Sequence, residues 1–524
     1  MHARPLHSNR ALSLLGWYAL GASLALAYTR LGQANLPPQA LFNSDMFYLP
    51  ALYLDIMRGG AVSAWRLTPA PYFFPDMPLY FGLHAITGGP RAALVVYGVV
   101  QVITLVVLVQ RIATRLVDSD IVRPLVLLGG AGLVLAVTAR YVPYTFALLQ
   151  PTTHFSVVLA AAAGLLIVLD ALVAPSPGYR APLLTALTVL AVASDILFIV
   201  QFVAPTVAAL ALLAVAGYRD RRRLLLLAGG MALGTAAGLY GGLALLHNTA
   251  VESYISFGWE NALRGSEELH AWLASEVRAG PGALIVSAMA IALCALLAVG
   301  QVRRAQGVRY EQLFALAYLP AAAGINVLFV IAAGRADFMR YIILPVVAGL
   351  LAWPMLMGAA TSRVAGMRRA AANAAIALAL GGVLLASALQ VSAGAIHGLL
   401  WDTPPLVHCL DEQAAARGLR HGISNYWQAK YISVLSRQGL HVVQVQPDLT
   451  PFHWINSIEW YDRDFEFIII DEASEGWHLL SQELIVSRFG EPADTFRCGA
   501  SLALVYDTPV FSGQFRDDLL LGAR

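Results

Sequence analysis

Long apolar stretches dominate this sequence and limit what it can fold into. A helix needs on the order of 20 apolar residues to cross a hydrocarbon core about 30 Å thick, and the chain holds about eleven stretches of roughly that length. Composition agrees, because 58% of the residues are hydrophobic and only 13% are charged. We therefore predict a polytopic membrane protein, mostly α, built as a bundle of transmembrane helices. The predicted spans are 12–29, 92–110, 124–139, 155–173, 182–194, 196–217, 224–246, 281–301, 311–333, 341–360 and 371–395.

Two of these spans meet at Ser194-Asp195. The first of the two is short, so the pair forms either two helices or one broken or re-entrant element. A carboxylate at the centre of a membrane helix costs about 2.5 to 3.5 kcal/mol on insertion scales, and acids there tend to be functional. Asp195 escapes most of this cost if its helix ends at Ser194 near the outer surface. We name Asp195 as a secondary candidate for a substrate cavity.

The first apolar run has two interpretations. It follows two arginines and ends in Ala25-Leu26-Ala27, the small-x-small pattern of a cleaved signal peptide. Its length, about 18 residues, is long for the apolar part of a signal. We therefore favour a retained first helix, and either outcome leaves the later loops on the same sides.

Arginine is unevenly distributed among the loops. Basic residues near helix ends are retained on the cytoplasmic side, and arginine-rich loops alternate here with loops poor in arginine. This pattern predicts a cytoplasmic N-terminus and an external tail. The bias for arginine over lysine, with Lys430 as the single lysine, suggests a bacterial inner membrane and hence a periplasmic tail. The arginine-rich loops hold Arg111, Arg115, Arg123, Arg180, Arg219, Arg221, Arg222, Arg223, Arg303, Arg304, Arg309, Arg363, Arg368 and Arg369.

The sequence changes character near residue 397. Helical and strand-like segments then alternate, which is typical of a small α/β layer structure. We predict a membrane domain, residues 1–396, with a long first outer loop at 30–91, and an extracytoplasmic α/β domain, residues 397–524. Cys409 and Cys498 either form a disulfide in an oxidising exterior or remain two buried thiols. The predicted helices of the tail are 406–417, 425–437 and 477–489, and its strands are 419–424, 440–446, 465–471 and 501–506.

The first outer loop is rich in polar and aromatic residues. Ser44 or Asp45 could cap a helix that runs to Met57. That helix would be amphipathic, with Phe47 and Ala51 on a face that could lie in the membrane interface. Further along the loop come Gly59-Gly60, Trp65 and the proline-rich stretch 71–80.

This order of features resembles the first outer loop of the GT-C glycosyltransferases: an acid soon after the first helix, an amphipathic stretch, a glycine pair, a tryptophan and a proline-rich segment. These membrane enzymes use polyprenyl-phosphate sugars and include protein mannosyltransferases and aminoarabinose transferases. In that superfamily an early carboxylate of this loop is catalytic, as a general base or a metal-associated acid, and by position the match falls on Asp45. Many helices followed by an outer α/β domain are also similar. Ser44-Asp45 departs from the adjacent acids that some of the families have.

The resemblance implies an inverting glycosyltransferase that moves a sugar from a polyprenyl-phosphate donor to a glycan, lipid or protein acceptor. Such transfer needs a base for the acceptor proton and cations for the leaving phosphate. Asp45 is the predicted base, although an acid here can also simply cap a helix. Asp76, among prolines and aromatic residues, either positions the acceptor or lies in a solvated turn. We interpret Asp55 as a solvated residue on the face of a helix.

Phosphate recognition is assigned to arginines on the outer side. Arg335 and Arg340 flank Asp337 in a short connection, and their planar forks suit phosphate. The alternative is a surface pair of Arg335 with Asp337, with Arg340 reaching to the interface. Glu252 and His154 are further candidates for lining the cavity, and a lone interfacial histidine is the simpler interpretation of His154.

Other functions compete with this one. The main alternative is a transporter or flippase for a lipid-linked or anionic solute, and a third is an inactive scaffold that holds the tail beside another enzyme. A divalent metal is compatible with the sequence, but the outer segments hold no zinc or calcium motif, and we name no metal ligand. Membrane lipids are expected partners. The net charge of +2 gives no indication of nucleic-acid binding.

Overall fold

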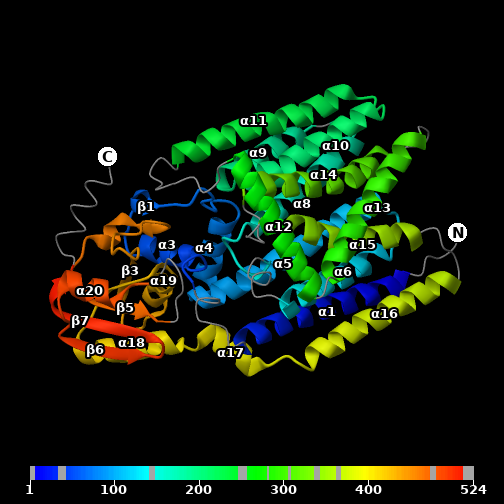
Figure 1. The fold of residues 1–524 in the computed structure, drawn as a ribbon. Coiled ribbons are helices and arrows are strands. Elements are labelled where there is room, and N and C mark those ends of the chain that lie inside the picture. The colour runs from blue at the N-terminus through cyan, green and yellow to red at the C-terminus, as the bar shows by residue number, and fades with distance from the viewer. Residues whose placement is uncertain are drawn as a thin grey trace.

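A bundle of helices carries a sheet-containing domain at one end (Figure 1). The computed structural model describes residues 6–33, 43–140, 148–176, 178–245, 257–279, 282–304, 309–334, 341, 343–361, 367–472 and 479–510. The sheet-containing domain is formed by the tail, and the N-terminus lies at the opposite end of the bundle. We call these two ends of the bundle the tail end and the far end.

Each predicted span lies on a helix. Among the described residues, seven helices are long and apolar enough to cross a membrane, and shorter apolar helices lie beside them. This supports an integral membrane protein, while the count of eleven spans stays a prediction. The helices are α1 (Leu6–Gln33), α5 (Pro90–Leu116), α6 (Val122–Arg140), α8 (Phe155–Val173), α9 (Arg180–Ser194), α10 (Ala204–Val215), α11 (Arg221–Leu245), α13 (Gly282–Arg304), α14 (Tyr310–Ala332), α15 (Ile343–Thr361) and α16 (Met367–Ala388).

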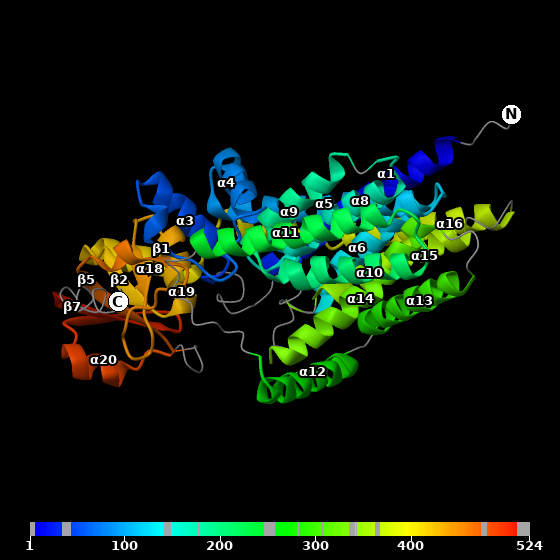
Figure 2. The ribbon, with the colours of Figure 1, turned by 90° about the horizontal axis from the view of Figure 1, so that it is seen from above.

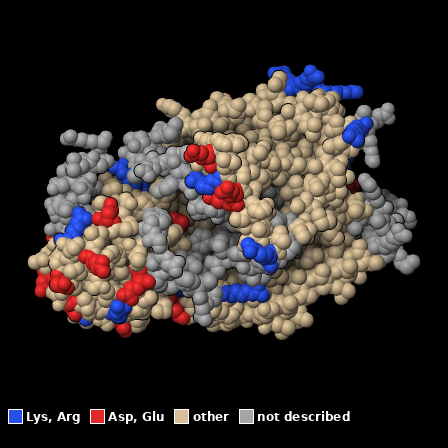
Figure 3. Space-filling model, in the orientation of Figure 1, with Lys and Arg blue, Asp and Glu red and all other residues tan. Residues whose placement is uncertain are grey.

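Charged side chains are sparse on the visible face of the bundle and frequent on the tail (Figure 3). This contrast fits a bundle that meets lipid and a tail that meets water, because charged side chains are costly in hydrocarbon.

The chain is interrupted at Ser194-Asp195, as the sequence indicated. Helix α9 ends at Ser194, and Asp195 has an extended backbone. A short π-helix, η2 (Ile199–Val203), then leads into α10. The break leaves the backbone and side chain of Ser194 free to bond a segment outside the bundle, and π-helical turns are frequent at functional sites.

Helix α12 (Trp259–Ala279) lies at the edge of the bundle and packs against α14 (Figure 2). Gly265 permits this close packing, because a Cβ atom there would lie 2.4 Å from the carbonyl oxygen of Ile331.

The tail contains a mixed five-stranded sheet with the strand order β3-β2-β5-β7-β6. Strand β2 runs parallel to both β3 and β5, whereas β7 is antiparallel to β5 and β6. The sequence predicted four of these strands and missed β6, which is short and polar. The strands are β2 (His421–Ser424), β3 (His441–Gln444), β5 (Phe465–Asp471), β6 (Asp494–Cys498) and β7 (Ser501–Val510), and the helices are α17 (Ala393–Trp401), α18 (Pro405–Arg417), α19 (Tyr426–Leu435) and α20 (Gln482–Phe489).

The first loop and the tail share one hydrophobic core. Helix α3 (Tyr48–Met57) of the loop packs against α19 of the tail, and α4 (Asp76–Thr87) leads from the loop into α5. Strand β1 (Trp65–Arg66) of the loop pairs antiparallel with β4 (Asn456–Ser457) of the tail. The loop is thus held in place from the tail as well as from the bundle.

Two expectations about α3 are wrong. Neither Ser44 nor Asp45 caps it, because the helix begins one turn later, after Phe47, which forms no side-chain cap bond. Asn43 orders the preceding turn instead, since its side-chain oxygen accepts a hydrogen bond from the Met46 amide at 3.0 Å. Phe47 and the neighbouring apolar face are buried in the core shared with the tail, so that face does not lie in the membrane interface.

Two further links stabilise the tail and its attachment. Cys409 on α18 and Cys498 on β6 form a disulfide, which confirms one of the two outcomes left open by the sequence. Buried Arg91, near the start of α5, donates hydrogen bonds to the carbonyl oxygens of Gly398 and Asp402, at the end of α17. The tail is therefore joined to the first span after the loop.

Candidate functional site

The candidate site is built around a turn, residues 151–154, that leads into α8 at the tail end. Thr152 has a φ of 63° and His154 a φ of 62°, a left-handed conformation that residues other than glycine seldom adopt. Tyr72, in the first loop, has a φ of 59°. Such conformations are held only where their surroundings fix them, and they gather at functional sites. Three of them in one small region therefore draw attention to it.

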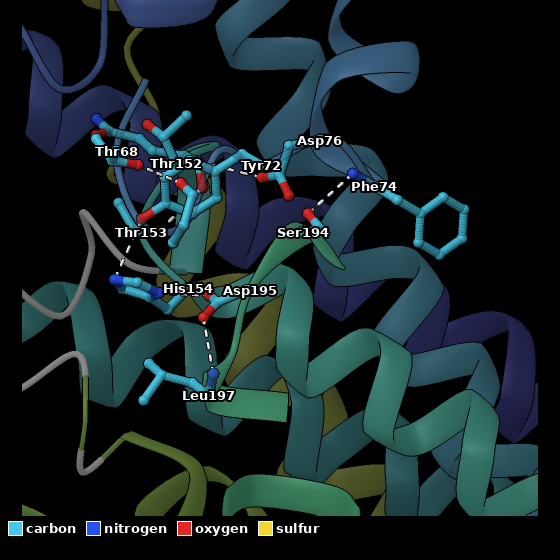
Figure 4. A network of polar contacts seen from close by, with 12 residues as sticks. Thr68, Tyr72, Phe74, Asp76, Thr152, Thr153, His154, Ser194, Asp195 and Leu197 are labelled. Carbon is cyan, nitrogen blue, oxygen red and sulfur yellow. Dashed lines mark hydrogen bonds and ion pairs between the residues drawn. The ribbon is translucent and has the colours of Figure 1, made fainter. Parts of the chain in front are cut away.

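His154 links the break in the bundle to the first loop (Figure 4). Its Nδ1 atom lies 2.5 Å from Oδ2 of Asp195, and its Nε2 atom lies 3.2 Å from the hydroxyl of Tyr72. The other oxygen of Asp195 accepts a hydrogen bond from the amide of Leu197 at 3.0 Å. All three side chains of this Asp195–His154–Tyr72 chain are buried. Asp195 and His154, two separate candidates in the sequence, thus form one pair.

The loop is also bonded to the broken end of α9. The amide of Phe74 donates to the hydroxyl of Ser194 at 2.9 Å, and the amide of Tyr72 donates to its carbonyl oxygen at 3.3 Å. A continuous helix would use that carbonyl internally. The interruption at Ser194-Asp195 therefore supplies the partners that hold the loop.

Asp76 lies at the base of the same turn. Its side chain is buried, and Oδ1 accepts hydrogen bonds from the Tyr97 hydroxyl at 2.8 Å and from the Thr152 amide at 3.1 Å. Burial raises the pKa of this carboxyl group, and these bonds oppose the rise because they stabilise the charged form. A solvated turn, one of the two interpretations from the sequence, is therefore wrong for Asp76.

Asp45 lies on the other side of Thr152, facing the tail. The Thr152 hydroxyl donates to the backbone oxygen of Asp45 at 2.9 Å, so one residue links Asp45 to Asp76. The Asp45 carboxylate accepts a hydrogen bond from the hydroxyl of Tyr426 on α19, and Ser44 donates to the Tyr426 carbonyl. Asp45 is only half-buried, unlike Asp76 and Asp195. It is the most accessible of the three acids.

Lys430 is buried in the tail close to Asp45. Its Nζ atom donates to Oε1 of Gln444 at 2.7 Å and lies 5.4 Å from the centre of the Tyr426 ring. Burial lowers the pKa of Lys430 well below its usual value, and the charge of Asp45 opposes this change.

Asp55 does not have the role expected from the sequence. Its carboxylate accepts a hydrogen bond from the indole of Trp65 at 2.7 Å and one from the indole of Trp460 at 2.8 Å. The interpretation of Asp55 as a solvated residue is therefore wrong. It joins the first loop to the tail.

Three candidates, Glu252, Arg335 and Arg340, lie outside the described residues. Tyr341, which directly follows Arg340 in the sequence, is described, and its ring centre lies 5.4 Å from that of His154. In the part of the chain that the structure covers, no group of three or more His, Cys, Asp or Glu side chains gathers as a metal site. No step proposed below uses a metal.

Several residues that hold the site together were not predicted from the sequence. Many similar residues surround three of them, Thr152, Tyr72 and Tyr97, in the sequence. No local pattern marks Thr152 and Tyr97 as partners of Asp76, or Tyr72 as the partner of His154. Tyr426 belongs to the tail, at the start of α19. Its contact with Asp45 joins positions 381 residues apart, and no periodic pattern reports such a contact.

Comparison with protein-family models gave no match, and comparison with curated protein sequences gave none either. The function of this chain is therefore inferred from the geometry of the site and from the resemblance of the first loop.

Proposed function

We propose that this protein is a membrane glycosyltransferase that moves a sugar from a polyprenyl-phosphate donor to an acceptor at the tail end of the bundle. The observation that carries the proposal is the convergence of Asp45, Asp76 and Asp195 on the turn 151–154. Acids held in different environments beside a junction of two structural layers are typical of catalytic sites. This convergence adds to the resemblance of the loop around Asp45.

Asp45 is the base of the proposed reaction. The acceptor oxygen or nitrogen attacks the anomeric carbon of the donor and forms the new glycosidic bond. The bond from that carbon to the phosphate oxygen breaks, and the polyprenyl phosphate leaves with the electron pair. The acceptor proton passes to the Asp45 carboxylate and then to water. Tyr426 orients this carboxylate by donating a hydrogen bond to it, and Lys430 lies nearby.

Asp76 acts as a positioning residue. Its Oδ1 atom holds the amide of Thr152, and the hydroxyl of Thr152 holds the backbone of Asp45. The Asp195–His154–Tyr72 chain fixes the other side of the same turn. Such support matters because small displacements of a reacting group cost large factors in rate.

Arg335 and Arg340 are proposed to bind the leaving phosphate. The position of Tyr341 beside His154 supports this, because Tyr341 immediately follows the segment that holds both arginines. In this proposal the N-terminus and the far end are cytoplasmic, and the tail is periplasmic in a bacterial inner membrane.

A transporter remains the second candidate function, because one observation favours it. The buried pair of Asp195 and His154 lies at an interruption between α9 and α10. Buried ionisable residues and broken helices are features of transporter binding sites. In that case the pair would bind the transported solute or a proton.

The decisive experiment measures sugar transfer in proteoliposomes that contain the full chain. Undecaprenyl phosphate carrying labelled mannose or aminoarabinose is supplied, one donor at a time, with a crude membrane extract as acceptor. We expect release of undecaprenyl phosphate and labelled product, and loss of both in Asp45→Asn. Asp118→Asn, an exposed acid at the far end, is the matched control and should retain activity.

Equal transfer by Asp45→Asn and the unaltered chain would reject Asp45 as the base. Passage of the intact donor across the bilayer, without transfer by the unaltered chain, would support the transporter instead.

A further inference from the structure

Helix α12 is a charged helix beside apolar ones, and the proposed reaction gives it no role. It is 21 residues long, close to the 23 residues of each of its neighbours α13 and α14. Six of its residues are charged, and it is not among the seven described helices that are apolar enough to cross a membrane. Its length therefore serves something other than a membrane span.

Helix α12 lies across the end of α14 instead of along it. Gly265 approaches Ile331, and both Leu269 and Trp272 pack against Val330, so two turns of α12 meet only the last turn of α14. In Figure 1, α12 runs across the direction of α14. Because α14 is long and apolar enough to span a membrane, its last turn marks the level of the membrane surface. Helix α12 thus lies at that level, at the tail end.

The exposed part of α12 has an apolar flank and a charged flank. Positions separated by whole helical turns lie on one face, so Trp259, Leu263 and Val277 form a single stripe. These three side chains are 78%, 50% and 57% exposed. A helix with two such flanks fits a boundary between apolar material and water. The charged flank consists of Glu260, Arg264, Glu267 and Arg278, which are all exposed.

The apolar flank adjoins surface of the bundle that is also apolar. Helix α12 leads into α13, where Ile285 and Met289 in the first turns are 49% and 55% exposed. Leu328, near the end of α14, is 67% exposed. Both helices are long and apolar enough to span a membrane, so the stripe continues a surface that faces acyl chains.

A second protein fits the stripe less well than lipid does. A stable interface between proteins takes about 20 to 30 residues from each side, whereas the stripe offers three side chains of one helix. Tryptophan and leucine are typical of helices that lie between headgroups and acyl chains.

We infer that α12 binds the surface of the lipid bilayer and lies in its plane. Trp259, Leu263 and Val277 enter the boundary between headgroups and acyl chains, and the charged flank meets water. Burial of apolar surface drives this contact, because the four acidic and two basic residues of α12 give no net attraction to anionic headgroups. The contact with lipid is independent of sugar transfer, so the inference does not rest on the proposed function.

Spin labels on single cysteines of the full chain, reconstituted in phosphatidylcholine vesicles, test this inference. Cys294→Ala removes the free thiol, since the other two cysteines form the disulfide. Labels are then placed by Leu263→Cys, Val277→Cys or Glu267→Cys, all at exposed positions. At 263 and 277 we expect more collisions with oxygen, which concentrates in hydrocarbon, than with a water-soluble nickel complex. At 267 we expect the reverse.

Two exposed leucines calibrate the measurement. Leu233→Cys, on the apolar span α11, should favour oxygen, and Leu484→Cys, on α20 of the tail, should favour nickel. Vesicles that contain phosphatidylglycerol should give the same preferences as phosphatidylcholine alone.

A preference for nickel at Leu263→Cys and Val277→Cys, as at Leu484→Cys, would overturn the inference because the stripe would then lie in water. Poor access of both reagents would also overturn it, since a protein partner or a second copy would then cover the stripe. A preference for oxygen that appears only with phosphatidylglycerol would overturn the assignment to apolar burial.

Discussion

The indole of Trp460 donates a hydrogen bond to the carboxylate of Asp55 at 2.8 Å, across 405 positions of the sequence. Trp65 donates to the other oxygen of the same carboxylate, and the two indole rings meet edge to face with centres 5.3 Å apart. One acid of the first loop thus holds a tryptophan of the loop and another of the tail. The role of Asp55 is structural, because its two hydrogen bonds hold the first loop, which carries Asp45, against the tail.

Asp55→Asn should loosen the contact between the loop and the tail. The amide offers one acceptor oxygen where the carboxylate offers two, so one indole N–H loses its partner, at a cost of about 1 to 3 kcal/mol. Hydrogen exchange of β1 and β4 in the full chain measures the effect. Asp507→Asn, at an exposed position of β7, is the control and should leave exchange unchanged. Unaltered protection in Asp55→Asn would contradict this role.

His154 and Asp195 should behave as a coupled pair. His154→Asn or Asp195→Asn alone leaves a buried polar group without its hydrogen-bond partner, which costs about 1 to 3 kcal/mol. The double variant should be scarcely less stable than either single variant, because the pair is lost only once. Thermal unfolding in detergent gives the coupling energy. The pair of exposed Arg264 and half-buried Glu268, 3.9 Å apart, should show almost none. Additive losses at His154 and Asp195 would argue against the pair.

The tail should lose stability as the pH falls, partly through His441. Burial lowers the pKa of His441 to about 3, and the charge of Arg463 acts in the same direction. Since an unfolded histidine titrates near 6.5, the unfolded tail binds the extra proton first. The contribution of His441 to the free energy of unfolding is therefore lost as the pH falls from about 6.5 towards 3. This loss amounts to about 2 kcal/mol between pH 7 and pH 5.

His441→Gln should flatten this pH dependence, whatever it does to stability at neutral pH. Hydrogen exchange of β3 at a series of pH values measures the slope. His408→Gln, an exposed histidine on α18, is the control and should keep the slope of the unaltered chain. An identical slope in His441→Gln would exclude His441 as its source.

The arginine pattern predicts opposite locations for the far end and the tail. Alkaline phosphatase, which folds only in an oxidising compartment, should be inactive when fused after Arg223 and active when fused after Trp401. Activity at the first position, or inactivity at the second with stable expression, would reject the proposed orientation.

Local patterns predicted the elements of this fold better than the contacts between them. Apolar length marked the apolar helices of the bundle but not the polar helix α12, and the strand Phe465–Asp471 was predicted with its observed bounds. Helix starts were harder, because the cap of α3 depends on the turn at Asn43 and not on the nearest acid. The predicted tail helix at 477–489 has its described start at Gln482 for a similar reason, since Ser481 caps it through the Leu484 amide.

The site was predicted as separate residues and not as an arrangement. Asp45, Asp76, His154 and Asp195 were all named from the sequence, but their linkage through Thr152 and Tyr72 was not. The left-handed residues of the turn are Thr152 and His154, and no glycine marks this conformation in the sequence. The residues that bond the turn from the first loop lie more than 70 positions away in the sequence. Hydropathy and periodicity report neither feature.

The core shared by the first loop and the tail has a consequence for the order in which the protein is assembled. Helix α3 leaves the ribosome early, whereas α19, which covers its apolar face, is made some 370 residues later. Until the end of the chain has been translated, Phe47 and its neighbours lack the part of their packing surface that the tail supplies. A polypeptide truncated before the tail would therefore also lose the native conformation of its first loop. Quality-control proteases would then encounter a chain that lacks the tail and has a misfolded first loop.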